Sequence, residues 1–444
     1  MGLKYIETIK SIVLLLLVIL SVMFTFTIWT FSPNYEQMEQ SQTVDISIAE
    51  KKTIDQIIKP YKVITNLKDQ VLGSVETSKI ETILSEMSTW HVTDLQLVST
   101  DLTKFDVAQV LRQPSQMSLY FSGEVPMLVY DNVLLMDDAN IPEATFNRLV
   151  IDWSQSTQMP LVHFLSEAGG VHYQAQVNLQ SRSNFLRNVL DVGQSFDEYA
   201  EIDRGNAPFL AVPKNPVMTT RNTYLQQEID PLVFRDALFS DPKAVRRNQV
   251  DSIHYEYGDN HALMNLNTKT KLLTFSNMPA TESQEPAIPS ELLLNTIDFV
   301  NEHGGWTDDF RYDYMNPLSR RVKFQLYADG LPVYSDQSET NEITQKWGES
   351  GVYQYIRPYF TLLDFKDEKV EEELLPGVEV AEELRESEEL DFDLIEEISV
   401  GYYMIRDEDQ GLITLQPCWY YLIKDNWFRF MPEETQGGGQ IGLE

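Results

Sequence analysis

Side chains that bind metals are few in this sequence. No histidine stands in a His-Glu-x-x-His pattern, and Cys418 is the only cysteine, so a Cys-x-x-Cys zinc site cannot form. His254 and His261 flank a predicted hairpin and could point the same way across its turn, but two surface histidines are the simpler interpretation. The remaining histidines are His91, His163, His172 and His303. We therefore predict neither a metal nor a cofactor.

Residues 407–411 resemble the beginning of an acidic calcium loop. An EF-hand requires Gly at its sixth position and Glu at its twelfth. Here Gly411 is fifth and Cys418 is twelfth. A hairpin turn between two strands is therefore the better interpretation.

The known patterns of nucleophilic catalysis are also missing from the sequence. It contains no Gly-x-Ser-x-Gly elbow, no Ser-x-x-Lys set and no P-loop. Cys418 lies in an apolar segment, where a buried structural thiol is the ordinary explanation. The 68 acidic residues make any single carboxylate pair uninformative. We predict no catalytic residue and expect that the protein is not an enzyme.

The charge balance limits the classes of partner. The formal net charge is -34, which repels nucleic acid and anionic membrane surfaces but suits a basic protein partner. Residues 364–397 hold sixteen acidic and three basic residues. Leucines and valines recur among these acids, so an amphipathic helix with a solvated acidic face is expected, with a docking surface or disorder as alternatives.

An uncharged apolar run near the N-terminus would determine on which side of a membrane the rest of the chain lies. A helix crosses a membrane with about 20 apolar residues, and residues 11–31 supply them. Lys4 and Lys10 precede the run, and Glu36 and Glu39 follow it. The flank of a membrane span that carries more Lys and Arg lies in the cytoplasm. Residues 1–10 are therefore expected in the cytoplasm, and the bulk of the chain is expected to be extracellular. The run is long for a cleaved signal peptide, which is the alternative.

Residues that follow this predicted span suggest contacts with the membrane interface, and one face of the span suggests contacts with a partner helix. Trp29, Phe31 and Tyr35 follow the run and are expected to anchor it at the membrane interface. Ser21 and Thr25 lie four residues apart and share one helix face, as in small-residue helix contacts. These hydroxyls could instead bond the preceding turn of their own helix.

The remaining sequence predicts an α+β fold with antiparallel sheets and packed helices. Helices are expected near residues 47–60, 77–87, 181–192, 231–239 and 290–302, and a meander of strands over residues 250–276. The sequence has neither a regular strand–helix alternation nor a dinucleotide fingerprint, which argues against an α/β fold. We predict a first extracellular α+β domain (34–195), a middle β-rich domain (196–285), a C-terminal α+β domain (286–435) and a flexible tail (436–444).

Several segments resemble one known family. Residues 9–14 and 27–36 look like the start of the YycH proteins of Firmicutes, and residues 327–334 and 401–422 resemble that family and its sister, the YycI proteins. The resemblance implies a single-pass membrane regulator of the sensor histidine kinase YycG, also called WalK, in a two-component system for cell-wall homeostasis. It implies action with YycI, through the transmembrane helix and the external domains, and a YycI-like C-terminal domain. Both restraint and activation of the kinase are described within the family.

Two functional hypotheses follow. The first is a non-enzymatic regulator whose helix and ectodomain bias a kinase between states, with a homo-oligomer also compatible. The second is an extracellular cell-wall enzyme or ligand-binding module. The abundance of acidic residues is all that the sequence offers for the second hypothesis.

Overall fold

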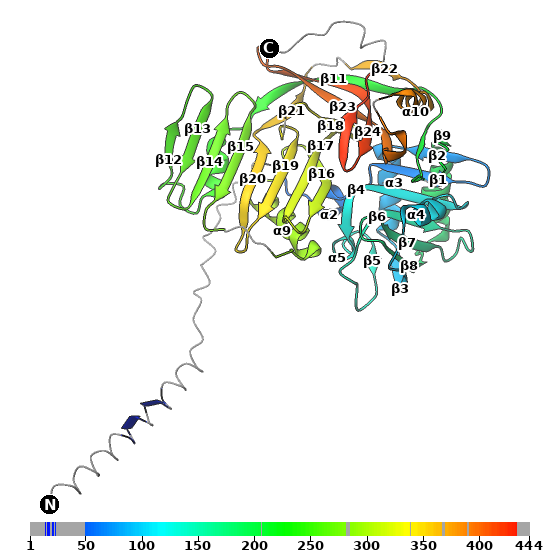
Figure 1. Ribbon diagram of the computed structural model, residues 1–444, viewed down its shortest axis with the longest axis horizontal. Coiled ribbons are helices and arrows are strands. Elements are labelled where there is room, and N and C mark those ends of the chain that lie inside the picture. The colour runs from blue at the N-terminus through cyan, green and yellow to red at the C-terminus, as the bar shows by residue number, and fades with distance from the viewer. Residues whose placement is uncertain are drawn as a thin grey trace, which may run out of the picture. The chain divides into compact units, whose positions relative to one another are not determined.

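The computed structural model describes residues 49–205, 207–280, 285–337, 339–365, 369–388 and 390–432, together with Leu14, Leu16, Leu17, Leu20, Ser21 and Met23. The chain divides into two compact units, Met1–Asp45 and Ile46–Glu444. The larger unit contains two sheets, which we call the N-terminal lobe (residues 54–213) and the C-terminal lobe (residues 217–432) (Figure 1).

The N-terminal lobe is built on a ten-stranded sheet in the order β10-β9-β2-β1-β4-β6-β7-β8-β3-β5. Neighbouring strands are antiparallel except for the short β3–β5 pair. The strands are β1 (Lys62–Asn66), β2 (Val71–Ser74), β3 (His91–Ser99), β4 (Gln116–Pro126), β5 (Leu135–Met136), β6 (Thr145–Asp152), β7 (Leu161–Ser166), β8 (Val171–Asn178), β9 (Asp197–Glu201) and β10 (Ala211–Pro213).

Helices cover both faces of this sheet. On one face α3 (Thr77–Met87) buries apolar residues at helical spacing, against a core that includes Leu119 and Phe121 of β4. On the other face α4 (Lys104–Leu111) packs near Tyr120 and Val150. The central strand β1 is consequently buried at every residue, as is typical of a strand covered on both faces. The other helical segments are α2 (Ile54–Ile57), α5 (Met127–Tyr130), α6 (Arg182–Phe185), η1 (Leu186–Asp191) and α7 (Val192–Gln194).

The C-terminal lobe holds a fifteen-stranded sheet whose main path runs β12-β13-β14-β15-β20-β19-β17-β18-β23-β24-β11-β21. β16 pairs with β17, β22 with β11, and β25 with β24. The strands are β11 (Val217–Glu228), β12 (Arg246–Gln249), β13 (His254–Gly258), β14 (Ala262–Asn267), β15 (Leu272–Asn277), β16 (Asp309–Asn316), β17 (Arg321–Ala328), β18 (Leu331–Tyr334), β19 (Glu342–Trp347), β20 (Val352–Pro358), β21 (Phe360–Asp364), β22 (Val370–Leu374), β23 (Glu397–Asp407), β24 (Leu412–Ile423) and β25 (Asn426–Arg429).

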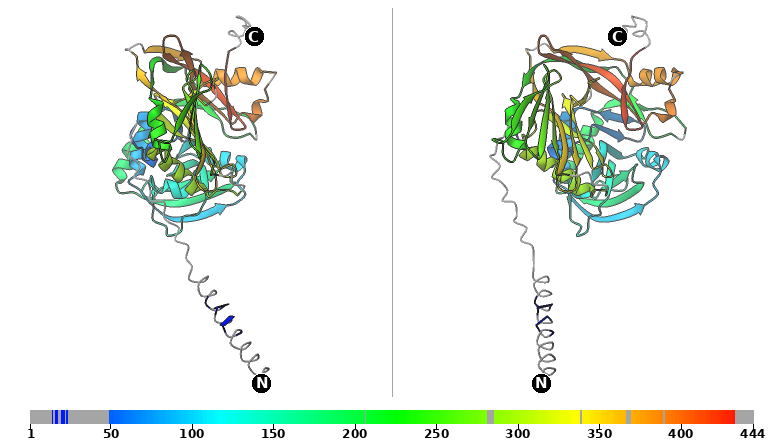
Figure 2. Two further views of the ribbon diagram at one scale, coloured as in Figure 1. Left: turned by 90° about the vertical axis from the view of Figure 1, so that its left-hand side faces the viewer. Right: turned by 60° about the vertical axis from the view of Figure 1, so that its left-hand side comes forward.

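Three helices and one turn of 3₁₀-helix support this second sheet. The helix α9 (Pro289–Glu302) packs Phe299 edge-on against Tyr355 of β20, with ring centroids 5.3 Å apart. After α8 (Pro231–Leu238), Phe239 packs against Phe275 of β15. The helix α10 (Gly377–Glu386) contacts β10 and β23 and so touches both lobes, and η2 (Phe392–Leu394) follows it (Figure 2).

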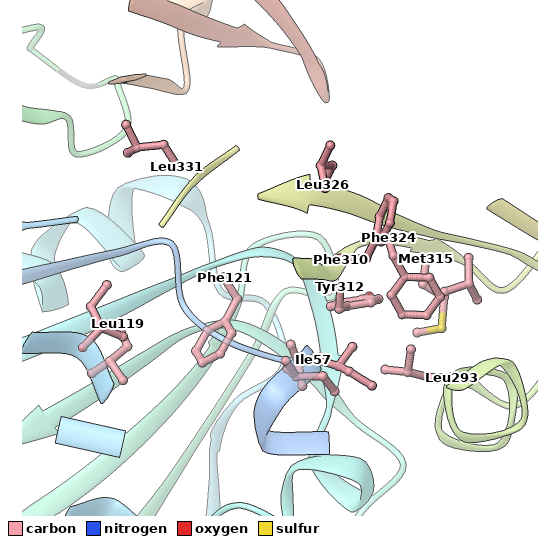
Figure 3. Close-up of a cluster of buried hydrophobic side chains, with 14 of the residues drawn as sticks. Ile57, Leu119, Phe121, Leu293, Phe310, Tyr312, Met315, Phe324, Leu326 and Leu331 are labelled. Carbon is pink, nitrogen blue, oxygen red and sulfur yellow. The ribbon is translucent and has the colours of Figure 1, made fainter. Parts of the chain in front are cut away.

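The two lobes share one hydrophobic core. Figure 3 shows Phe121 of β4 on one side and Tyr312 and Phe324 of β16 and β17 on the other, with Ile57 of α2 between them; all four belong to one cluster of buried side chains. The Tyr312 hydroxyl donates a hydrogen bond of 2.6 Å to the Glu124 carbonyl oxygen. Because the apolar cluster runs without a break from one sheet to the other, the lobes are packed rather than loosely linked.

The predicted elements agree with the structure in most places. The helix over residues 77–87 and the hairpin strands of the meander are confirmed, as is the α+β mixture with antiparallel pairing. Within the described part of residues 47–60, only Ile54–Ile57 is helical. The division into three extracellular domains stays a prediction. The chain leaves the first sheet after β10, which ends at Pro213, and enters the second sheet with β11, which begins at Val217.

The predicted span at residues 11–31 lies almost wholly outside the described residues. The six residues described there are helical and exposed. Among the described residues, no helix reaches the length and apolar character that crossing a membrane requires.

Candidate functional site

The residues proposed for the membrane helix are only partly visible in the structure. Ser21 is helical and exposed, as the sequence predicts for a helix face. Thr25, Trp29, Phe31 and Tyr35 lie outside the described residues, so the contact face and the interface anchors stay predictions.

The junction between the lobes contains a buried ion pair. Lys62 Nζ of β1 lies 2.6 Å from Glu397 Oε2 of β23, and both side chains are 3% exposed. The Tyr61 hydroxyl donates to the same oxygen at 3.0 Å. Burial lowers the pKa of Lys62, and the Glu397 carboxylate opposes this shift. A buried pair needs such partners because removing two charges from water is costly.

Aromatic rings extend this junction on the side of the N-terminal lobe. The Tyr120 ring lies 4.5 Å from both Lys62 Nζ and the Arg148 guanidinium carbon. Burial raises the pKa of Tyr61 and Tyr120, which keeps both phenols neutral. No local pattern in the sequence indicates this cluster, because Lys62 and Glu397 are 335 residues apart. The arrangement joins one lobe to the other.

The histidines singled out from the sequence do not come together. His254 Nδ1 lies 2.8 Å from Asp251 Oδ2 beside the turn before β13, and the backbone of His261 instead bonds Asp259. Two other histidines do meet: His163 Nδ1 and His172 Nε2 are 2.9 Å apart on β7 and β8. The sequence held a signal for this pair, because Gly169 and Gly170, which are typical of a turn, lie between the two histidines.

The acidic segments have structural roles. Residues 407–411 form the turn between β23 and β24, where Asp407 Oδ1 accepts from the Gln410 amide at 3.0 Å and Gly411 has φ 65°, so the hairpin interpretation is confirmed. The stretch 364–397 is only partly the expected helix: α10 is amphipathic, but β22 and η2 flank it.

Cys418 is a partly buried free thiol on β24, and burial raises its pKa.

Comparisons with known proteins agree with this picture. The model of the YycH protein N-terminal domain matches residues 7–191, and that of the YycH protein C-terminal domain matches residues 208–434. The chain is 21% identical over 428 residues to the two-component system WalR/WalK regulatory protein YycH of Bacillus subtilis (strain 168), covering 93% of this chain and 94% of the relative.

A solved structure shares the fold. The crystal structure of YycH from Bacillus subtilis superposes with a TM-score of 0.72 at 17% identity, covering 87% of this chain and all of the other. At this identity the likeness shows the fold alone. With both family models matched along nearly the whole length, the chain belongs to the YycH family.

Proposed function

We propose that this protein is a membrane-anchored, non-enzymatic regulator of the sensor histidine kinase YycG/WalK of a WalR/WalK two-component system. The observation that carries the proposal is the match along 93% of the chain to a relative named as a regulatory protein of that system. In this proposal YycI is a second partner, and residues 34–435 lie outside the cell.

A regulator of this kind must bind two kinase conformations unequally. A partner that binds both states with the same affinity leaves their populations unchanged. The helix face of Ser21 and Thr25 is where we expect the difference to arise, because residues four apart lie on the same side of a helix. The apolar neighbours described there, such as Leu17 and Leu20, are helical and exposed.

The external part supports this role by acting as one body. The buried Lys62–Glu397 pair and the continuous apolar core hold the two lobes together. A force or contact at one lobe would therefore reach the other without a hinge between them.

Exchanging residues 11–31 for an unrelated membrane span tests the helix. We expect phosphorylation of the response regulator to change by about fivefold or more, as is typical of coupling between sites. The double variant Ser21→Leu/Thr25→Leu should reproduce the change. The matched control Thr27→Leu alters a hydroxyl that helical spacing predicts on another side of the helix, and it should leave the output unchanged. Unchanged output in the exchanged chain would remove the span from the mechanism.

Co-purification tests the partners. The full-length chain, extracted in detergent, should retain the histidine kinase and YycI. Recovery of neither protein would contradict the proposal. Release of muropeptides from peptidoglycan by the purified chain would contradict its non-enzymatic character.

A further inference from the structure

A polar cavity in the N-terminal lobe is separate from the lobe junction. Its volume is about 720 Å³, within the range of small-molecule sites. α4 and the segment before it form one wall. The floor consists of four side chains from the neighbouring strands β4, β6, β7 and β8: Gln116, Asp152, His163 and His172.

Strand register places these four side chains on one face. Gln116 is opposite Asp152, and Asp152 is opposite Leu161, two residues before His163. His172 is opposite Leu165, again two residues from His163. Since side chains alternate along a strand, all four point toward the face that α4 covers.

Two floor groups are deeply buried yet lack a hydrogen-bond partner among the described residues. Gln116 is 4% exposed and its Oε1 has no partner, and His163 is 8% exposed and its Nε2 has none. His163 Nε2 lies 3.6 Å from Asp152 Oδ2, beyond hydrogen-bond range. Buried polar atoms are normally paired, so unpaired ones beside a cavity are positions where a bound group can form hydrogen bonds.

The cavity carries negative charge. Asp101, Asp106 and Asp152 line it, and none of the lining residues that the structure describes is Lys or Arg. Burial would raise the pKa of Asp152, but polar contacts with His163 and Ser154 outweigh it and lower the pKa to about 2. Burial and the neighbouring His163 lower the pKa of His172 to about 4, so His172 is neutral near pH 7.

We propose that this cavity binds a small organic molecule through a primary ammonium group. An ammonium has three donors and no acceptor, which suits a floor of carboxylate and amide oxygens. Its bond to Asp152 would be charge-assisted, and Gln116 Oε1 would accept a second hydrogen bond. The proposal does not depend on the regulatory role.

A pair of matched probes tests the charge requirement. Putrescine and 1,4-butanediol have the same chain length, but only putrescine is cationic. We expect calorimetry on the full-length chain in detergent to show putrescine binding at least tenfold tighter than the diol. Equal binding, or no binding of putrescine at about 1 mM, would overturn the proposal. Calcium chloride is a third probe; calcium binding without putrescine binding would mean a metal site instead.

Variants locate the binding. Asp152→Asn should weaken putrescine binding at least tenfold, whereas Asp409→Asn, in the distant β23–β24 turn, should leave it unchanged. Gln113→Glu adds a carboxylate at the exposed rim and should tighten binding several-fold without disturbing the core. Equal affinity of the Asp152→Asn and Asp409→Asn variants would place any binding elsewhere and refute the site.

Discussion

Replacing Lys62 by Met removes one half of the buried ion pair between the lobes. Glu397 would keep the Tyr61 hydroxyl at 3.0 Å and the Ile398 amide at 3.0 Å, but would lose the cation 2.6 Å away. Leaving a buried charge unpaired in this way costs about 3–5 kcal/mol. We therefore expect a large loss of stability from a substitution that preserves side-chain volume.

The size of the thermal shift follows from the size of the folded unit. Unfolding entropy is about 2.1 cal/mol/K per residue, which gives about 0.8 kcal/mol/K for roughly 380 residues. If the lobes unfold together, a loss of about 3–5 kcal/mol lowers Tm by about 4–6 °C. Scanning calorimetry of the full-length chain in detergent measures this shift.

A neighbouring ion pair provides the control. Lys104 Nζ lies 2.7 Å from Glu396 Oε1 and also joins the lobes, but its side chain is 51% exposed. Exposed pairs contribute about 0–1 kcal/mol, so Lys104→Met should lower Tm by about 1 °C or less. Equal Tm values for the Lys62→Met variant and the wild type would refute the expectation that the buried ion pair is needed for stability. The double variant Lys62→Met/Glu397→Leu should regain most of the loss, since no charge is left unpaired.

Two further predictions concern the folded unit. The pKa of His172 is lowered to about 4 from 6.5, so the stability that the neutral ring contributes is complete above pH 6.5 and is lost as the pH falls toward 4. The Tm of the His172→Gln variant should therefore fall less over this interval than the Tm of the wild type. The same dependence of Tm on pH in both proteins would contradict the shift. Gly123→Ala would place a Cβ 2.5 Å from the Asp313 carbonyl oxygen of the other lobe, whereas Gly411→Ala meets open space but has φ 65°. The left-handed backbone at Gly411 costs an alanine about 1–2 kcal/mol. Gly123→Ala should lower Tm by more than Gly411→Ala does, and the reverse order would contradict the close contact.

Local patterns explain what could be predicted from the sequence. The helix α3 carries Ile80, Ile83 and Leu84 at helical spacing, and the strands β13 to β15 alternate between polar turns. In such segments the signal lies within one element. The strand β1 is buried on both faces, so its residues do not alternate between apolar and polar. Without that alternation this short strand was not predicted.

Contacts between segments that are far apart in the chain could not be predicted from the sequence. Nothing in the neighbourhood of Lys62 or Glu397 indicates that they meet, and their pairing depends on how two sheets pack. The pair His163–His172 was closer to prediction, since Gly169 and Gly170, which lie between the two residues, are typical of a hairpin turn. Its register, which decides whether the rings meet, depends on the turn, and a shift of one residue would have placed one ring on the opposite face.

The most direct test of the regulatory claim is a reconstitution. The kinase YycG/WalK and YycI would be placed in lipid vesicles with or without the full-length chain, and kinase autophosphorylation would be followed over time. The proposed function predicts that saturating amounts of the chain change the rate by about fivefold or more, in either direction. The same rate with and without the chain, while the chain is shown to be bound, would contradict it.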